Sequence, residues 1–290
     1  MNLTTPESLC MLSDNDIDTI FRFTVRIATK KIREFRLQLK NGTVECGNGN
    51  NPVKDFSISI QELYIKQIKS FLPTHGIIAK EGKNGPTTIS SSLKPGLYWS
   101  IDSIDGINAL VNGQSSGIST GVCLFSNERF ISAYVGDVCT QEVFGFCVGK
   151  NTVYQYIDDS ENRLMVNTKP LSQARLLLRA LPRQHSDLVV ELVSHFDNFL
   201  IRGGGISSWI ISLWTGEAMA AVIPDSIEYP WERNPIYAIS LALGFVFLRP
   251  SKDGLAWNKY IPDPVFASRT VPHDILIIHG DIWKQICGEH

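Results

Sequence analysis

The order of the apolar patterns along the chain limits the folds that it can adopt. Two amphipathic helical patterns, at about residues 14–35 and 60–72, precede a run of strand patterns. Beyond about residues 162–169, short strand patterns alternate with helical ones. Such alternation is typical of layered α/β structure, because strands and helices bury their apolar faces against each other. We therefore predict an α/β fold, a layered α-β-α-β-α sandwich, in which subdomains 1–165 (α+β) and 166–290 (α/β) form one compact unit.

The same patterns place individual elements. Ser13 and Asp14 precede the first helical pattern and are suited to cap it. In the first half we expect strands at 77–79 and 98–101, and two hairpins formed by 119–125 with 130–135 and by 142–148 with 152–156. In the second half we expect strands at 176–180, 199–201, 245–247 and 275–278, and helices at 186–196, 207–220 and 234–243.

Composition excludes several classes of protein. The 290 residues are 43% hydrophobic and 19% charged, which is typical of a globular chain. The net charge is −2 and the basic residues form no cluster in the sequence, so we expect no nucleic-acid partner. The longest apolar run, residues 237–248, is shorter than the roughly 20 residues of a membrane span. It predicts a buried helix that leads into a strand, and no membrane association.

The N-terminus and the cysteines indicate a cytoplasmic protein. Residues 1–12 contain Glu7 and no basic segment, unlike a secretory signal. None of the six cysteines forms a CxxC pair, and no histidine lies three to five residues from another. A structural zinc site is therefore not expected, and buried, reduced thiols are.

An acidic pair follows an apolar strand pattern in the segment Trp99-Ser-Ile-Asp-Ser-Ile-Asp-Gly106. Asp102 and Asp105 are three residues apart, with the carbonyl of Ile104 between them. Carboxylate and carbonyl oxygens at a strand end suit a hard cation such as Mg²⁺. If a helix begins after Gly106, its free amides could hold a phosphate in the same pocket. On spacing alone, an aspartate-capped turn is the commoner explanation.

Four segments together resemble the inositol monophosphatase / fructose-1,6-bisphosphatase superfamily. Residues 77–82 (IIAKEG) look like the strand that ends in the paired glutamates of that family, and residues 99–110 resemble its W-x-x-D-P-[IL]-D-G-T-x-x-F signature. Residues 202–207 (RGGGIS) look like its R-x-x-G-[ST]-A element, and residues 229–238 (YPWERNPIYA) resemble its W-D-x-A-A and Y-E-C-N-P-M-A elements. The resemblance covers most of residues 14–280 and implies the layered fold, Mg²⁺ and, as in many members, a homodimer.

The resemblance also implies a role for each matching residue. Asp102 would bridge two Mg²⁺ ions, and the remaining metal ligands would be Ile104 through its carbonyl, Asp105 and Glu232. The phosphate would lie at the amides of Gly106 and Ile107, next to Asn108. The other substrate-binding residues would be Arg202, Gly205, Ile206, Ser207 and Asp225, with Glu228 as an alternative to Asp225.

Three positions depart from the family pattern. Lys80 stands where the family has a metal-binding glutamate, and could pair with an aspartate in place of a metal, unless a one-residue shift in register brings Glu81 into the site. Ile107 replaces a threonine whose hydroxyl helps to activate water, and its side chain can neither donate nor accept a hydrogen bond. Gln61 replaces an acidic residue. The candidate catalytic residues are thus Lys80, Glu81, Asp102, Asp105 and Ile107, and loss of a general base typically slows hydrolysis by about 10²–10⁴.

Three functions remain open at this point. The chain resembles a Mg²⁺-dependent phosphomonoesterase for a small polyol, sugar or nucleotide phosphate, with impaired activation of water. It could instead be a repurposed enzyme that uses the pocket for non-hydrolytic, metal-independent chemistry, with Lys80 as acid, base or anion anchor. It could also be a catalytically inactive binding protein. In each case the expected partner is a small phosphorylated or polyol-like ligand.

Overall fold

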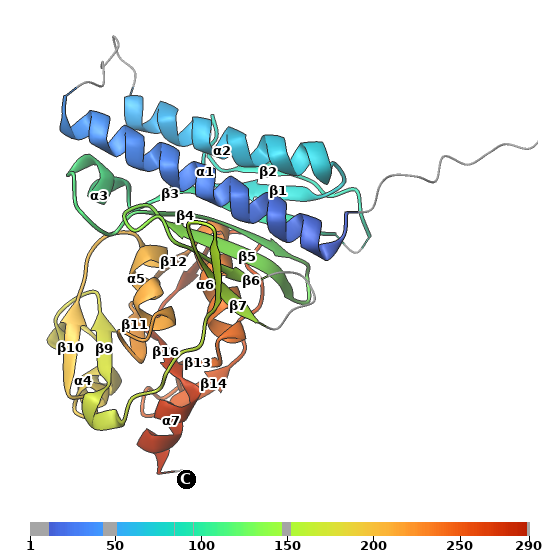
Figure 1. Cartoon of the computed structure of the whole chain (residues 1–290). Helices are drawn as coiled ribbons and strands as arrows, with labels where there is room; N and C mark the ends of the chain where they lie inside the picture. Colours follow the sequence, from blue (N-terminus) through green and yellow to red (C-terminus); the bar gives the residue numbers. More distant parts are fainter. Residues whose placement is uncertain (1–11, 43–50, 84, 95, 147–151, 289–290) are drawn as a thin grey trace, which may run out of the picture.

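Helices and strands stack in alternating layers in the computed structural model of the chain (Figure 1). The structure describes residues 12–42, 51–83, 85–94, 96–146 and 152–288. Within these ranges, an eight-stranded and a six-stranded sheet form the two β layers. One pair of helices covers the outer face of the first sheet, a second pair lies between the sheets, and further helices cover the second sheet. The predicted α-β-α-β-α sandwich is confirmed.

The first layer consists of α1 (Asp14–Lys40) and α2 (Pro52–Phe71). The hydroxyl of Ser13 accepts a hydrogen bond from the Asp16 N–H, and the Asp16 carboxylate accepts one from the Ser13 N–H. This reciprocal cap confirms the predicted start of α1. α2 begins at residue 52 rather than at about 60, because the side chain of Asn51 caps a first turn that Pro52 preorganises.

The first sheet brings two strand ends together at one edge. β1 and β3 run parallel, while the other neighbours are antiparallel, so the residues that follow β1 lie beside the end of β3. β3 continues to Asp105, beyond the predicted end at residue 101, and the short helix α3 (Ile107–Val111) follows it. In spatial order the strands are β2 (Thr87–Ile89), β1 (Gly76–Ala79), β3 (Tyr98–Asp105), β4 (Ser119–Phe125), β5 (Phe130–Asp137), β6 (Val143–Phe146), β7 (Val153–Ile157) and β8 (Ser160–Arg163).

The second half of the described chain builds the second sheet. Its spatial order is β10 (Asn198–Ile201), β9 (Arg175–Leu178), β11 (Ala220–Ile223), β16 (Ile275–His279), β13 (Phe245–Pro250) and β14 (Trp257–Tyr260). β12 (Ser226–Glu228) and β15 (Arg269–Val271) form a separate ribbon. The helical elements are η1 (Leu171–Gln173), η2 (Pro182–Gln184), α4 (Asp187–Val193), α5 (Ile206–Trp214), α6 (Pro230–Ala242) and α7 (Gly280–Cys287). The proposed subdomain boundary at residue 165 would fall between β8 and β9.

Some boundaries predicted for the second half are wrong. The predicted helix 207–220 extends too far: α5 ends at Trp214, Gly216 adopts a φ of 72°, and Ala220 already begins β11. A glycine in this left-handed conformation is a common helix terminator. α6 begins at residue 230 rather than 234, which places Glu232 in its first turn. The predicted turn at 149–151 lies outside the described residues.

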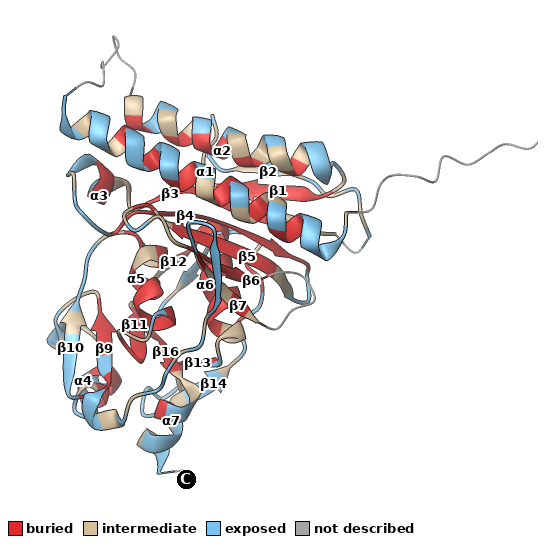
Figure 2. Cartoon of the chain, viewed as in Figure 1, coloured by how far each residue is buried: buried red, intermediate tan, exposed pale blue. Residues whose placement is uncertain are grey.

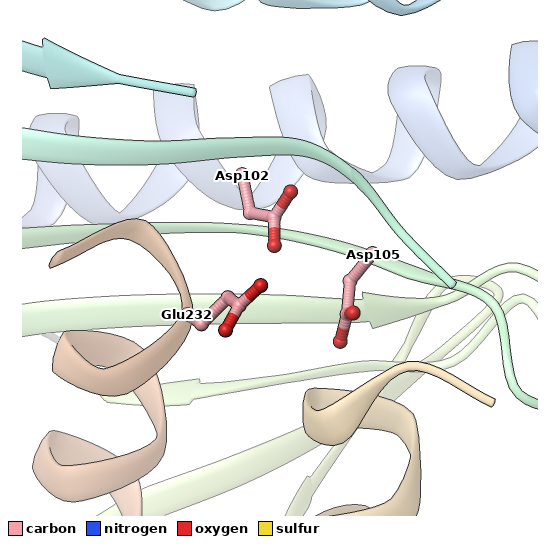
Figure 3. A group of neighbouring side chains, drawn as sticks. All are labelled: Asp102, Asp105 and Glu232. Atoms are coloured by element: carbon pink, nitrogen blue, oxygen red, sulfur yellow. The ribbon is translucent and has the colours of Figure 1, made fainter. Parts of the chain in front are cut away.

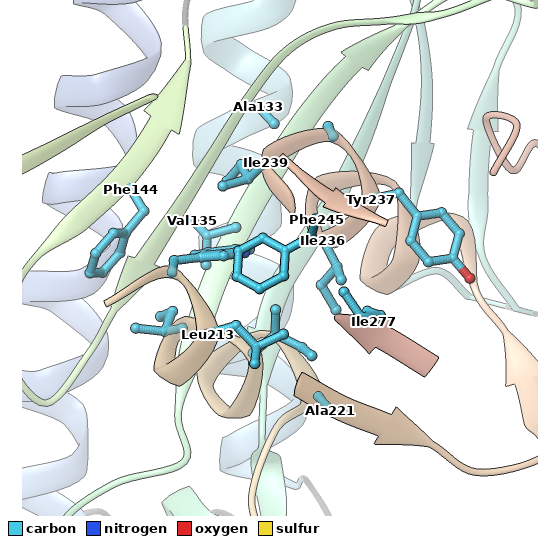
Figure 4. Packing of buried hydrophobic residues seen from close by; sticks show 14 of the residues in the cluster. Ala133, Val135, Phe144, Leu213, Ala221, Ile236, Tyr237, Ile239, Phe245 and Ile277 are labelled. Atoms are coloured by element: carbon cyan, nitrogen blue, oxygen red, sulfur yellow. The ribbon is translucent and has the colours of Figure 1, made fainter. Parts of the chain in front are cut away.

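The two sheets share a core built around α5 and α6. Phe144 of the first sheet, Leu213 of α5, Ile239 of α6 and Ile277 of the second sheet belong to one buried cluster (Figure 4). α6 lies between the sheets and is coloured as buried along most of its length (Figure 2). Residues 237–248 form the end of α6 and the start of β13, as predicted. This packing fixes α6 against β3, β4 and β5 of the first sheet. Among the described helices, none combines the length and apolar character that a membrane crossing requires.

Candidate functional site

Three carboxylates converge at the end of β3 (Figure 3). Asp102 and Asp105 lie in β3, and Glu232 lies in the first turn of α6. Residues three apart in a regular strand point to opposite faces. Here the pairing of β3 with β4 is irregular between Asp102 and Asp105, and both carboxylates turn toward Glu232. One oxygen of each side chain lies within 4.8 Å of the others.

The ammonium group of Lys80 lies in this acidic cluster. Ala79 pairs with Ile101 in the parallel β1–β3 register, so the next residue, Lys80, lies beside Asp102. Its Nζ donates to Oδ1 of Asp102 at 3.1 Å and to the carbonyl of Ile104 at 2.7 Å. The family resemblance assigns both of these oxygens to a metal ion. Lys80 therefore occupies, with its own charge, a position expected for Mg²⁺.

Burial and the neighbouring charges shift the pKa values of the side chains in the cluster. Burial raises the pKa of Asp102 to about 6, and Lys80 opposes this shift while Asp105 adds to it. Burial, together with Asp102 and Asp105, raises the pKa of Glu232 to about 7. Burial lowers the pKa of Lys80, but attraction to Asp102 and Asp105 outweighs it, and the net shift is upward. One permanent positive charge thus faces three carboxyl groups, of which two titrate near neutral pH.

The strand end is held so that Lys80, and not Glu81, reaches the aspartates. The hydroxyl of Ser57 donates to Oε1 of Glu81 at 2.8 Å and lies 2.9 Å from the hydroxyl of Ser103. The side chain of Gln61 donates to the carbonyl of Glu81 and accepts from its N–H, both at 2.7 Å. These paired hydrogen bonds oppose the one-residue shift in register that would exchange the two side chains.

Backbone contacts tie the loop before α5 to Asp105 and Gly106. The N–H of Ser207 donates to Oδ2 of Asp105 at 2.7 Å. A Cβ at Gly205 would lie 2.5 Å from Oδ1 of Asp105, so any larger residue would displace the carboxylate. Gly106 has a φ of 86°, and a Cβ there would overlap the carbonyl of Gly117. Both positions therefore require glycine.

A cavity of about 650 Å³ opens beside the acidic cluster. This volume lies in the range of small-molecule sites. Its lining includes Lys80, Asp105 and Glu232, and five of the residues predicted to bind substrate: Gly106, Ile107, Asn108, Gly205 and Ile206. Segments far apart in the sequence thus line one pocket.

Comparison of the sequence with known families agrees with this geometry. The sequence model of the inositol monophosphatase family matches residues 15–218, which is more than half of the chain. The chain belongs to this family. Membership supports a function of the phosphatase type. No curated protein matches the chain significantly.

Solved structures of proteins from several bacteria have the same fold as this chain. Inositol monophosphatase II from Staphylococcus aureus MSSA476 is 18% identical, with 93% of each chain covered and a TM-score of 0.66. SuhB from Mycobacterium tuberculosis is 14% identical, with 96% of each chain covered and a TM-score of 0.65. The extragenic suppressor protein SuhB from Bartonella henselae is 11% identical, covers 93% of this chain and 96% of its own, and has a TM-score of 0.66.

Two residues assigned to substrate by resemblance to the family lie elsewhere. Asp225 is exposed and does not line the cavity beside the acidic cluster. Arg202 pairs with the carboxylate of Glu217 and lines a different cavity. In this structure Arg202 pairs with Glu217 and Asp225 is exposed, so neither lines this cavity, and their role in substrate binding stays a prediction. Ser207 acts through its backbone on Asp105, as described above.

Two charged residues that line the cavity were missed. Arg179 follows β9 and Arg233 follows Glu232 in α6, and both residues line the cavity. No family motif marks Arg179, and only the loop contacts of the folded chain bring it here. Arg233 could have been predicted as a site residue, since it directly follows Glu232, a predicted metal ligand.

The residues of this family member fit one Mg²⁺ ion better than two. Oδ2 of Asp102 is buried and has no hydrogen-bond partner among the described residues. With Asp105 and Glu232 it forms a set of hard oxygen donors suited to a divalent cation. On the other side, Oδ1 of Asp102 and the carbonyl of Ile104 already accept from Lys80. A second cation there would be repelled by the ammonium, so that position does not fit a metal.

Proposed function

We propose that the chain binds a small phosphorylated ligand, such as a polyol, sugar or nucleotide phosphate, and that its capacity for metal-dependent hydrolysis is impaired. The position of Lys80 carries this proposal, because its ammonium bonds the two oxygens, on Asp102 and Ile104, that one metal ion would need. The chain would then be a repurposed inositol monophosphatase in which a fixed organic cation replaces one metal.

Ligands of structural neighbours support the ligand class. Inositol monophosphatase II of Staphylococcus aureus has been solved with inositol monophosphate bound (17% identity, TM-score 0.66) and with 2′-AMP bound (17% identity, TM-score 0.63). Both ligands are small phosphate esters. The cavity of about 650 Å³ in this chain is large enough for a molecule of that size.

Several residues of the cavity can bind a phosphate, but the residue that would help to activate water is replaced by Ile107. Lys80 supplies positive charge, and the backbone at Gly106 and Ile107 lies at the cavity wall. Mg²⁺ held by Asp102, Asp105 and Glu232 would add a further positive charge for a phosphate oxygen. The side chain of Ile107 cannot take a proton.

The direct test is release of phosphate from inositol, sugar and nucleotide monophosphates in the presence of Mg²⁺ or Mn²⁺. We expect the wild type to be slow, and the double variant Lys80→Glu, Ile107→Thr to be faster by at least about tenfold, since each change restores a group that acts on water. Asp102→Asn in the double variant should abolish the gain. Fast hydrolysis by the wild type that the double variant does not improve would overturn the proposal.

A second candidate function is a phosphomonoesterase that uses one metal ion. Oδ2 of Asp102 favours it, because this buried carboxylate oxygen has no hydrogen-bond partner among the described residues and could hold a divalent cation. Both functions allow one Mg²⁺ ion to bind, so the rate of phosphate release, measured beside isothermal titration with Mg²⁺, separates them. Stoichiometric binding that disappears in Asp105→Asn, together with phosphate release that disappears in the same variant, would favour the one-metal enzyme.

A further inference from the structure

Two arginines give the cavity a positive wall that the inositol monophosphatase motifs do not account for. Arg179 comes from the end of β9, and Arg233 comes from the first turn of α6. Neither forms an ion pair with a carboxylate among the described residues. Two other arginines of the same half do form ion pairs: Arg202 pairs with Glu217, and Arg269 pairs with Glu228.

Arg233 is the more unusual of the two. Its side chain is buried, with 2% of the residue exposed. Nη2 donates to the hydroxyl of Ser226 at 2.8 Å, while Nε and Nη1 have no partner within the described chain. A buried guanidinium with two unsatisfied nitrogens is strongly unfavourable unless an anion completes its hydrogen bonds. Arg233 lines the cavity, which is where such an anion can enter.

Arg179 is held in position by neutral groups. Nη1 donates to the carbonyl of Gly204 at 2.9 Å, and the guanidinium lies 5.7 Å from the ring centroid of Trp209. Burial lowers the pKa of Arg179, and the nearby charge of Arg233 lowers it further, although Asp105 and Glu232 act in the opposite direction. The charge of Asp105 thus acts on Arg179 more strongly than that of Arg233. Both arginines line the same cavity, and an anion there would satisfy the nitrogens of Arg233 that have no partner within the described chain.

We propose that Arg179 and Arg233 bind a second acidic group of the ligand. The ligand class is then a small molecule with a phosphate and, in addition, a second phosphate or a carboxylate. Arginine is suited to both groups, because its planar fork donates two parallel hydrogen bonds to either. This inference rests on the proposed function, since it assigns the first phosphate to the Lys80 side of the same cavity.

Three probes that share one phosphorylated sugar skeleton test the inference. Glucose 6-phosphate carries a single acidic group, 6-phosphogluconate adds a carboxylate, and glucose 1,6-bisphosphate adds a second phosphate. Calorimetric titration of the full chain measures each Kd. We expect at least one of the two doubly acidic probes to bind about 10–100-fold more tightly than glucose 6-phosphate, the factor expected of hydrogen bonds to a charged group. The preferred probe identifies the second group as carboxylate or phosphate.

Variants test whether the arginines cause the tighter binding of the doubly acidic probes. In Arg179→Gln the ratio between the Kd for glucose 6-phosphate and that for the preferred probe should fall to about twofold or less. Arg163→Gln removes the same charge from an exposed position on β8 and should leave all three Kd values unchanged. Arg233→Gln is the second variant, and its melting temperature is measured first because Arg233 is buried. The result for Arg179→Gln decides the question whatever that temperature is.

Two failures can be told apart. If glucose 6-phosphate binds but neither doubly acidic probe binds more tightly, or if the preference survives in Arg179→Gln, the role of the arginines is refuted and the proposed function stands. If none of the three probes binds, or if Lys80→Ala leaves every Kd unchanged, the proposed function is refuted together with this inference.

Discussion

Replacing Lys80 with methionine should destabilise the protein at pH 8 much more than at pH 5. Methionine keeps most of the length of the side chain but removes the ammonium that lies 3.1 Å from Oδ1 of Asp102. Asp102 is 1% exposed, so it cannot exchange this partner for water. The variant therefore leaves a buried carboxylate beside Asp105 and Glu232 without its cation.

The size of the effect follows from the geometry. At 3.1 Å and an effective dielectric constant of about 20, the attraction between the two charges is about 5 kcal/mol. Part of it offsets the loss of hydration of both groups. Removing one partner of a buried ion pair typically costs about 3–5 kcal/mol. Because 21% of the Lys80 side chain is exposed, we expect the lower end, about 3 kcal/mol, at pH 8.

The pH dependence comes from the carboxyl groups and not from the lysine. The pKa of Lys80 is raised, so the lysine is charged and its contribution is complete at both pH 5 and pH 8. Asp102 and Glu232 have pKa values raised to about 6 and 7 in the folded chain. A raised carboxyl pKa favours the folded state at low pH, and this advantage disappears as pH rises through the folded value. Without Lys80 both pKa values rise further, so the loss of stability above pH 6 becomes larger.

Urea denaturation at the two pH values measures the effect. With a slope of roughly 3 kcal/mol per molar urea, the midpoint should fall by about 1 M at pH 8 and by less than about 0.4 M at pH 5. Lys66→Met, at an exposed position of α2, is the matched control and should shift neither midpoint appreciably. Equal shifts at both pH values, or a loss below about 1 kcal/mol at pH 8, would show that Lys80 does not neutralise the cluster.

Three further outcomes test parts of the site. Gly205→Ala should lower stability by about 2 kcal/mol or more because its Cβ would overlap Asp105, whereas Gly203→Ala, where a Cβ meets nothing within 4 Å, should be neutral in urea denaturation. His75 accepts a hydrogen bond from Trp99 and burial lowers its pKa to about 4, so its NMR titration should have a midpoint well below pH 5, and a midpoint near 6.5 would contradict this environment. Gln61→Leu should lower the free energy of unfolding by about 2–3 kcal/mol, because two hydrogen bonds to the backbone of Glu81 are lost, and a change below about 0.5 kcal/mol would argue against their role.

The metal-site motif could be predicted from the sequence because its chemistry is local. Asp102 and Asp105 end an apolar strand, and Glu232 stands in a recognisable element, so all three were expected in one cluster and lie there. The pairing of Lys80 with Asp102 was also among the expected alternatives. A homodimer and a cytoplasmic location stay predictions.

The features that were missed depend on tertiary contacts. Short strands such as β12 and β15 have three residues each, too few for a periodic pattern, and they exist because they pair with each other. The first eight residues of α2 were overlooked because the cap at Asn51 follows a stretch of sequence rich in glycine and asparagine. Arg179 reaches the cavity only through the contact of its guanidinium with the carbonyl of Gly204. No local pattern encodes such a contact.

The lysine bridge to Asp102 and Ile104 makes one cation of the pocket a covalent part of the chain. An ion bound from solution is present in proportion to its free concentration and can be withdrawn by a chelator, whereas Nζ of Lys80 is present at the same stoichiometry in every folded molecule. The positive charge beside Asp102 and Ile104 is therefore in place as soon as the chain folds. Ligand affinity that arises there is thereby uncoupled from the supply of magnesium in the surroundings.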